Sequence, residues 1–290
     1  MKKIAVVDAH VHVFPLEMCA GRSTHIERDR WFSSLYGNPK AMLATAEDLV
    51  ASMDGAGIAR SIACGFPWAD SGLCREHNAY LADAAHRFPD RLSWLGIVNP
   101  RADTAERDAR WCFENGASGL GEINADAQGI DLRDSQAFRA IAGVCIEADH
   151  PLLLHASEHV GHAYPGKGTA TPEKLLALLS SFLDLRVVAA HWGGGLPFYE
   201  LMPEVAALTG RLSYDSGAST YLYGFQVFRT VLDIVGRDRV LFGSDYPVLK
   251  QGRFLELTRA TSWRSDDEQA AVLSENAVRV YGLPVGEACE

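Results

Sequence analysis

The sequence lacks a long hydrophobic run, an excess of positive charge and a phosphate-binding loop. No segment of the 290 residues approaches the apolar length of about 20 residues that a membrane-spanning helix needs. The net charge of −10 and the pI of about 5.5 disfavour nucleic acid and anionic membranes as partners. The glycine run at residues 193–195 is not followed by the Lys-Ser/Thr pair of a phosphate loop. A small-molecule substrate is therefore the expected partner.

The sequence also lacks a Cys-x-x-Cys pair and the apolar core of a signal peptide. Asp8 interrupts the short apolar run that follows the basic start of the chain. Scattered cysteines of this kind favour unpaired thiols in a reducing compartment. We therefore expect a cytoplasmic protein. The six cysteines are Cys19, Cys64, Cys74, Cys112, Cys145 and Cys289.

Strand-like and helix-like segments alternate along the whole chain. The expected strands are residues 4–11, 58–64, 91–98, 117–123, 151–155, 186–191, 212–215 and 240–244. The expected helices are residues 45–55, 71–88, 103–115, 135–148, 172–183, 197–208 and 221–235, with a final outer helix at 265–281 and a long loop at 14–44. Such alternation implies parallel strands joined by crossover helices. The pattern predicts an α/β fold, a (β/α)8 TIM barrel with a C-terminal outer helix, as one domain over residues 1–290.

Two histidines lie two residues apart at the end of the first apolar run. In a strand, the side chains of His10 and His12 point to the same face, so both imidazoles aim at one point. This is a geometry that metal ligands adopt. The alternative is a pair of polar residues on a half-buried strand.

Further candidate ligands follow other apolar runs. His155 follows residues 151–154, His191 follows residues 187–190, and Asp245 follows residues 240–244. The carboxyl ends of barrel strands meet at one face, where active sites lie. The recurrence predicts one shared site, whose nitrogen and oxygen donors suit Zn(II) or a similar divalent ion.

Four motifs carry a resemblance to a known family. They are residues 8–12 (DAHVH), 154–156 (LHA), 190–195 (AHWGGG) and 242–247 (FGSDYP). In their order, spacing and strand placement, the chain resembles the amidohydrolase superfamily. It is most similar to the branch that contains aminocarboxymuconate-semialdehyde decarboxylase.

The resemblance implies a role for each strand-end residue. His10, His12, His155 and Asp245 would bind a divalent ion, with Zn(II) favoured and one ion per chain expected. His191 would be a catalytic residue that orients or deprotonates a metal-bound water. Asp245 would be catalytic as well, accepting a proton from that water. Coordination lowers the pKa of such a water toward about 7.

Glu122 ends the fourth strand, where some superfamily members place a carboxylate between two metal ions. The residue has two interpretations: it recruits a second ion together with His191, or it holds the ligands of a single ion by hydrogen bonds. We favour a single ion and treat Glu122 as a candidate ligand, with two ions as the alternative.

The polar segment 155–168 and several aromatic residues are candidates for substrate contacts. His159, His162 and Lys167 would bind an anionic group, or the two histidines would extend the metal site; the alternative is a solvated surface loop. Trp192 and Tyr221 are expected near the barrel mouth, where they form a pocket wall or simply pack. Other aromatic residues in predicted mouth loops are Trp31, Phe32, Trp68 and Tyr223.

The reaction is less determined than the family. We favour a metal-dependent hydrolase in which metal-activated water attacks an amide, ester or lactone. The alternative is a nonoxidative decarboxylase of an unsaturated or aromatic acid, which residues 191–198 (HWGGGLPF) resemble; Arg22, Arg28 and Arg30 would then anchor the substrate carboxylate. A barrel that retains metal without catalysis is a third interpretation. A homodimer is the expected assembly.

Overall fold

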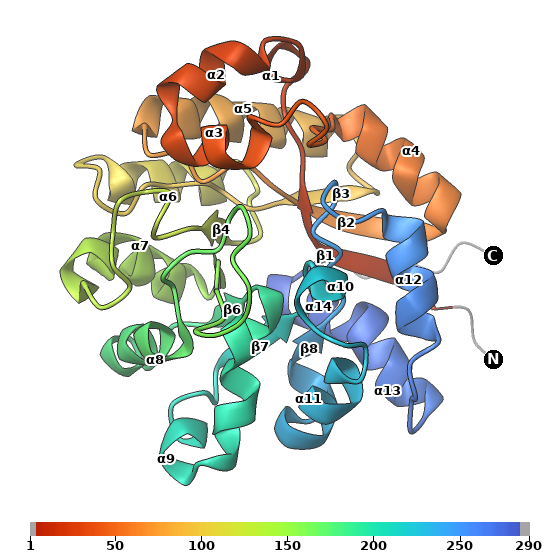
Figure 1. Ribbon diagram of the computed structural model, residues 1–290. Coiled ribbons are helices and arrows are strands. Elements are labelled where there is room, and N and C mark those ends of the chain that lie inside the picture. The colour runs from red at the N-terminus through yellow and green to blue at the C-terminus, as the bar shows by residue number, and fades with distance from the viewer. Residues whose placement is uncertain (1–3, 285–290) are drawn as a thin grey trace.

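The computed structural model describes residues 4–284, and strands and helices alternate through this range (Figure 1). Each of the eight predicted strands is present within it, which confirms the predicted barrel. Several strands are shorter than expected, and the shortest are β3 with three residues and β8 with two. The strands are β1 (Val6–His12), β2 (Ile58–Cys64), β3 (Leu92–Trp94), β4 (Leu120–Ile123), β5 (Leu152–Leu154), β6 (Val187–Ala189), β7 (Leu212–Asp215) and β8 (Val240–Leu241).

The strands pair in parallel, in the orders β1-β2-β3 and β4-β5-β6-β7-β8. Two short parallel bridges join these sheets. Gly96 pairs with Leu120 between β3 and β4, and Val11 pairs with Tyr246 between β1 and the end of β8. The amide of Ala9 also donates to the carbonyl of Phe242 at 2.8 Å. The sheet is therefore closed into a barrel.

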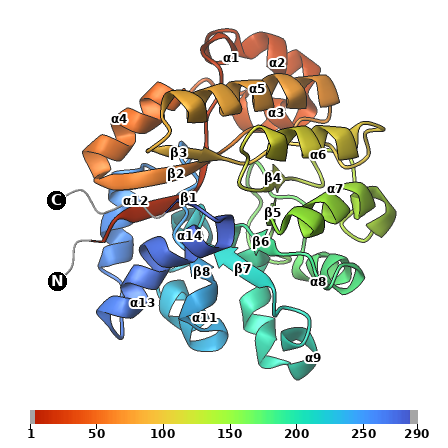
Figure 2. The same ribbon diagram turned by 180° about the vertical axis from the view of Figure 1, so that it is seen from behind.

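Helices surround the strands on the outside of the barrel (Figures 1 and 2). No helix within residues 4–284 has the length and apolar run that a bilayer span requires. The helices are α1 (Leu16–Ala20), α2 (Arg22–Arg28), α3 (Arg30–Tyr36), α4 (Ala46–Ala56), α5 (Ser71–Arg87), α6 (Ala105–Glu114), α7 (Ser135–Ala148), α8 (Pro172–Ser181), α9 (Pro203–Ala206), α10 (Ser219–Leu222), α11 (Val227–Val235), α12 (Gln251–Arg259), α13 (Asp266–Ala270) and α14 (Asn276–Tyr281). Shorter or wider turns are η1 (His191–Leu201), η2 (Arg237–Arg239) and η3 (Ala271–Glu275).

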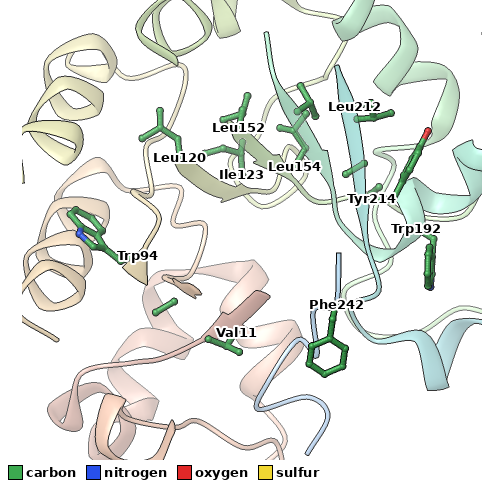
Figure 3. Packing of buried hydrophobic residues seen from close by; sticks show 14 of the residues in the cluster. Val11, Trp94, Leu120, Ile123, Leu152, Leu154, Trp192, Leu212, Tyr214 and Phe242 are labelled. Carbon is green, nitrogen blue, oxygen red and sulfur yellow. The ribbon is translucent and has the colours of Figure 1, made fainter. Parts of the chain in front are cut away.

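The main core lies between the strands and the surrounding helices (Figure 3). Alternate strand residues such as Leu152, Leu154 and Leu212 point outward into it and are at most 1% exposed. Parallel strands buried on both faces need this continuously apolar sequence. The described cysteines also belong to the interior or its edge: all five in residues 4–284 are unpaired, and Cys289 lies outside the described residues.

A second cluster fills the inside of the barrel. Val7, Leu153 and Leu241 point inward there and pack against Ala277 and Tyr281 of α14. This final helix lies outside the barrel, as predicted, and covers its N-terminal end, near the middle of the barrel in Figure 2. The opposite end is left for the strand-end polar residues.

The segment expected to be a loop at residues 14–44 contains three helices, α1, α2 and α3. Asp29 begins α3, because its Oδ1 accepts hydrogen bonds from the amides of Trp31 and Phe32 at 2.9 and 2.8 Å. Phe32 then stacks on Trp68, with ring centroids 5.0 Å apart. The sequence interpretation missed this N-cap because the aromatic cluster that stabilises the helix forms only in three dimensions.

Three other helix boundaries differ from expectation. Residues 197–208 form the end of η1 and the short α9 instead of one helix, because Pro197 and Pro203 divide the segment. Residues 221–235 form α10 and α11, separated at residues 223–226. Helix α12, which follows β8, was not predicted.

Gly96 occupies a crowded position at the junction of the two sheets. An added Cβ atom there would lie 2.6 Å from Cys112 Cβ. We expect Gly96→Ala to lower the free energy of unfolding by about 1–3 kcal/mol, because the helix must shift. Gly143, an exposed residue of helix α7, has no atom within 4 Å of an added Cβ. Gly143→Ala should raise stability by about 0.5–1 kcal/mol. Denaturant unfolding measures the free energy of unfolding of both variants. Equal changes in this free energy would contradict the two predictions.

Candidate metal centre

Strand β1 brings two imidazoles together at the carboxyl end of the barrel. His10 is fully buried and His12 is 7% exposed. Their Nε2 atoms lie 3.1 Å apart. The shared orientation follows from the two-residue period of a strand, as the sequence predicts.

The outer nitrogen of each ring fixes its tautomer. His10 Nδ1 donates to Asp215 Oδ2 at 2.9 Å, and His12 Nδ1 donates to the carbonyl of Gly65 at 3.1 Å. Because a carboxylate and a carbonyl oxygen can only accept, both Nδ1 atoms carry a proton. In neutral rings the two Nε2 lone pairs therefore face one another. Lone pairs this close require a cation beside them, which is either a proton or a metal ion.

Glu122, at the end of β4, joins two groups of histidines. Its Oε2 lies 3.8 Å from His10 Nε2 and 3.6 Å from His12 Nε2. Its Oε1 lies 3.0 Å from His155 Nδ1 and 3.3 Å from His191 Nε2. One oxygen thus faces each histidine pair. Sequence analysis treated Glu122 as a secondary candidate, whereas the structure places it at the centre of the cluster.

Asp245 lies at the edge of this cluster nearest β8. Its Oδ1 is 3.4 Å from His12 Nε2 and 3.9 Å from His10 Nε2. The amide of Asp245 donates to the carbonyl of His10 at 2.8 Å. The preceding residue, Ser244, donates through its amide and hydroxyl to the carboxylate of Asp8 at 2.8 and 2.6 Å. These contacts between the first and last strands fix the position of the Asp245 side chain.

The charges of the cluster attract cations. Burial disfavours a charged His10, but Asp215 and Glu122 outweigh burial and raise the pKa of His10 to about 10. Burial also opposes a charged His191, and the hydrogen bond to Glu122 raises the pKa of His191 to about 9. Burial favours a neutral Glu122, yet His155 and His10 hold its pKa well below the usual range. Without another cation, the carboxylates hold protons on these histidines.

These donors fit a divalent ion. Two groups have ligand atoms that all lie within 4.8 Å of one another: His10, His12 and Glu122 in one, and Glu122, His155 and His191 in the other. Imidazole nitrogens and carboxylate oxygens suit Zn(II) and Mn(II) alike. Asp245 lies beside the first group, and His155 belongs to the second. The ligands predicted as one set therefore lie on two sides of Glu122.

The cluster lies in a cavity of about 780 Å³ at the barrel mouth. Loops that follow β1, β2, β5, β7 and β8 supply its walls, which are mostly aromatic and aliphatic. Such a cavity suits an apolar small molecule with a few polar groups. The apolar wall residues include Trp31, Leu35, Tyr36, Met42, Phe66, Tyr164, Tyr221, Leu222, Val248, Leu249, Phe254 and Leu257.

Only some of the predicted substrate-binding residues line the cavity. His162 and Tyr221 line the cavity, whereas His159 and Lys167 do not. Lys167 instead stabilises its own loop, because its Nζ donates hydrogen bonds to the carbonyls of Val160 and His162 at 2.8 and 3.1 Å.

Trp192 also lies away from the cavity, although we expected it near the barrel mouth. The side chain is fully buried, and its indole nitrogen donates to Ser219 Oγ at 2.7 Å. Its ring packs edge-on against Phe228 (ring centroids 4.9 Å apart), so Trp192 stabilises the core (Figure 3).

The cations at the cavity also differ from those that the sequence suggested. Arg22, Arg28 and Arg30 do not line it. They lie on α2 and at the start of α3, and Arg22 donates to the carbonyl of Asn38 at 3.3 Å. Lys40, Lys250 and Arg253 line the mouth instead. No sequence motif surrounds these residues that would have placed them there.

Two further residues were missed. Asp215 ends β7, the same strand-end position that identified the other candidates, and its Oδ1 accepts from the amides of His191 and Gly217 at 3.0 and 2.8 Å. Tyr36 lines the cavity on α3 and is 7% exposed. Burial, with help from Asp245, raises the pKa of Tyr36 well above its usual value, so its hydroxyl remains a donor.

A family model described as amidohydrolase matches residues 7–283. The chain belongs to this amidohydrolase family. The match begins in β1, ends beyond α14 and includes every residue of the metal centre. The resemblance inferred from the four motifs is therefore confirmed.

Solved structures of similar fold include several decarboxylases. The 5-carboxyvanillate decarboxylase of Sphingomonas paucimobilis has a TM-score of 0.81 and 15% identity, covering 97% of this amidohydrolase and 100% of that chain. The Novosphingobium aromaticivorans enzyme, complexed with manganese and 4-hydroxy-3-methoxy-5-nitrobenzoic acid, gives 0.80 and 21%, covering 97% and 96%. A dihydroxybenzoic acid decarboxylase of Polaromonas, with manganese and 2-nitroresorcinol, gives 0.76 and 17%, covering 97% of each chain. At these identities the likeness establishes the barrel fold.

Glu122 should contribute to metal binding at both histidine pairs. We expect Glu122→Gln to weaken the binding of divalent ions about 10–100-fold, because the charge that faces each pair is lost. Elemental analysis after dialysis and competition with a chelator measure this effect. Glu114→Gln, on the exposed end of α6, is the matched control and should keep the wild-type metal content. Equal metal content in all three proteins would contradict the central role of Glu122.

Asp215 should set the tautomer of His10. In Asp215→Asn the amide oxygen must stay on the amides of His191 and Gly217, so the NH₂ group faces His10 Nδ1. It then donates to Nδ1, forces the proton onto Nε2 and removes the lone pair that a metal needs. We expect metal affinity to fall about 10–100-fold in a chelator competition titration. The exposed Asp103→Asn serves as control, and unchanged affinity in Asp215→Asn would refute the assignment.

Proposed function

We propose that this protein is a metal-dependent, nonoxidative decarboxylase of a small aromatic or unsaturated carboxylic acid. The observation that carries the proposal is the position of the histidine and carboxylate cluster in an apolar cavity of about 780 Å³. Aromatic walls that include Trp31, Tyr36 and Phe66 fit the flat body of such an acid. The cluster then receives its carboxylate end.

The comparison structures support the proposal by their fold and by what they bind. Two of them hold manganese together with a nitro-aromatic ligand, and their names describe decarboxylases of aromatic acids. The chain covers nearly their full length, so no large part of those enzymes lacks a counterpart here. Mn(II) therefore joins Zn(II) as an ion to test.

The charge distribution favours the entry of an anionic substrate. Lys40, Lys250 and Arg253 are exposed cations at the mouth of the cavity. Positive side chains at the entrance of a low-dielectric cleft raise the local concentration of anions. Arg253 pairs with Glu256 at 3.5 Å, so Lys40 and Lys250 supply most of the positive charge where a carboxylic acid would approach.

The histidines, Glu122 and Asp245 would hold a divalent ion, which would supply positive charge that stabilises negative charge on the substrate. The protein supplies orientation and the proton. Tyr36 donates a hydrogen bond from the cavity wall to a substrate oxygen. Asp245, whose side chain is 10% exposed against 7% for Glu122, faces the cavity and delivers the proton.

The step is balanced without a redox cofactor. The bond between the ring or alkene carbon and the carboxylate breaks, and CO₂ leaves. The electron pair stays on that carbon and takes a proton from Asp245. The products are CO₂ and the acid with hydrogen in place of its carboxylate, and one proton from solvent restores the enzyme.

Hydrolysis is the second candidate, and Glu122 is the observation that favours it. A carboxylate shared between two histidine pairs resembles the paired-metal sites that hold an attacking water and a leaving oxygen. A hydrolase of amides, esters or lactones would use such a pair. The negative charge of Glu122 also resists a substrate carboxylate unless cations offset it.

Incubation of the Mn(II)- or Zn(II)-loaded protein with substrate panels distinguishes the two reactions. One panel contains hydroxybenzoic, carboxyvanillic and unsaturated acids, and the other contains lactones, esters and amides. We expect CO₂ release from the first panel and, in D₂O, one deuterium on the carbon that lost its carboxylate. Asp245→Asn should lower kcat at least about 100-fold. The exposed Asp103→Asn should not.

Turnover of the second panel alone, with ¹⁸O from water in the product, would replace decarboxylation by hydrolysis. Full activity of Asp245→Asn on an acid would reject the assigned proton donor and leave the reaction class standing.

A further inference from the structure

A second cavity lies at the end of the barrel opposite the metal centre. It has a volume of about 190 Å³ and four arginines in its wall. Arg186, Arg211 and Arg239 directly precede β6, β7 and β8, and Arg279 belongs to α14. The metal-centre residues instead follow their strands. The parallel barrel therefore separates the two sites by the length of its strands.

The charge of this cavity is opposite to that of the chain. No acidic residue lines it among residues 4–284, although the chain has 37 acidic residues against 27 basic ones. A chain with more acidic than basic residues is not expected to line one cavity with several arginines and no acidic residue. Arginine is the side chain best suited to planar, multidentate recognition of carboxylate and phosphate.

Two of the arginines form a fixed wall. Arg186 donates to the carbonyls of Asp149 and Val280 and pairs with the carboxylate of Asp149 at 3.3 Å. Arg239 pairs with Glu200 and donates to the carbonyl of Thr209 at 2.9 Å. Both terminal nitrogens of each guanidinium have protein partners, so these two arginines position the wall rather than bind a ligand.

The other two arginines keep free donors. Arg279 uses only one nitrogen, which donates to the carbonyl of Asp238 and to Asn276 Oδ1. Arg211 has no hydrogen bond or ion pair from its side chain within the described part of the chain. Most other exposed arginines, such as Arg110 and Arg133, pair with carboxylates.

A serine hydroxyl also lines this cavity. Ser213 of β7 is 8% exposed and lines the cavity. Its hydroxyl has no hydrogen-bond partner among residues 4–284. A hydroxyl without a protein partner is free to donate to a ligand in the cavity. The cavity volume is several times the roughly 30 Å³ of one water molecule.

We propose that this cavity binds a small oxyanion, of the phosphate or carboxylate class, between Arg211, Arg279 and Ser213. The bound anion connects β7 with α14, the helix that covers the barrel end. Because the unfolded chain lacks the site, the anion stabilises the folded protein by mass action. The site is independent of the proposed decarboxylation.

Calorimetric titration tests the site with inorganic phosphate as the probe, on protein purified in phosphate-free chloride buffer. We expect one phosphate per chain and a rise in melting temperature with phosphate concentration. Arg211→Gln with Arg279→Gln should weaken binding at least about tenfold, and Ser213→Ala about threefold. Arg259→Gln, at an exposed arginine on α12 outside both cavities, removes one positive charge and should have no effect. Succinate in place of phosphate distinguishes carboxylate from phosphate as the preferred class.

The metal centre is a competing place for phosphate, and Glu122→Gln separates the two. Binding that persists in Glu122→Gln and is lost in the double arginine variant supports the proposal. Binding lost in Glu122→Gln and kept in the arginine variant would overturn it, as would the absence of any stoichiometric binding up to about 20 mM phosphate, a concentration far above that needed for a charge-assisted site. Circular dichroism of the arginine variants verifies that folding is unchanged.

Discussion

The close approach of His10 Nε2 and His12 Nε2, at 3.1 Å, is the constraint on which the rest of the site depends. Strand β1 fixes the spacing of the two rings, while Asp215 and Gly65 fix their tautomers from opposite sides. Neutral rings held in this way repel one another unless a cation is present. The carboxylates of Glu122 and Asp245 beside them have the same requirement, because two buried negative charges also need a positive partner.

The barrel fold places these ligands together at one end of the molecule. Parallel strands bring their carboxyl ends to one face, and α14 closes the other face with Tyr281 packed inside the barrel. The apolar cavity therefore lies beside the metal ligands, where α3, the loop that follows it, α10 and α12 form its rim. Desolvation in this cavity strengthens every electrostatic interaction between the cluster and a substrate.

Sequence reasoning found what local rules determine and missed what depends on distant packing. The strand-end histidines were predictable because alternation and parallel topology together decide where His10, His12, His155 and His191 point. The role of Glu122 as the link between two pairs depends on which oxygen faces which ring, and no sequence rule fixes that. The mouth cations were misassigned to Arg22, Arg28 and Arg30, because α3 is held by an aromatic cluster formed from three separate segments.

The charge of Glu122 bears directly on the choice between reactions. With a single ion, a substrate carboxylate would approach Glu122 while His155 and His191 hold its Oε1. A protonated His191, whose Nε2 lies 3.3 Å from Glu122 Oε1, neutralises much of that repulsion, and decarboxylation is then compatible with one ion. With two ions, a metal ion would take the place of the proton at each histidine pair. The two ions would then neutralise the charge of Glu122 from both sides. Two ions held by these residues would activate a water molecule, which favours hydrolysis. The number of bound ions therefore decides which chemistry this cluster favours.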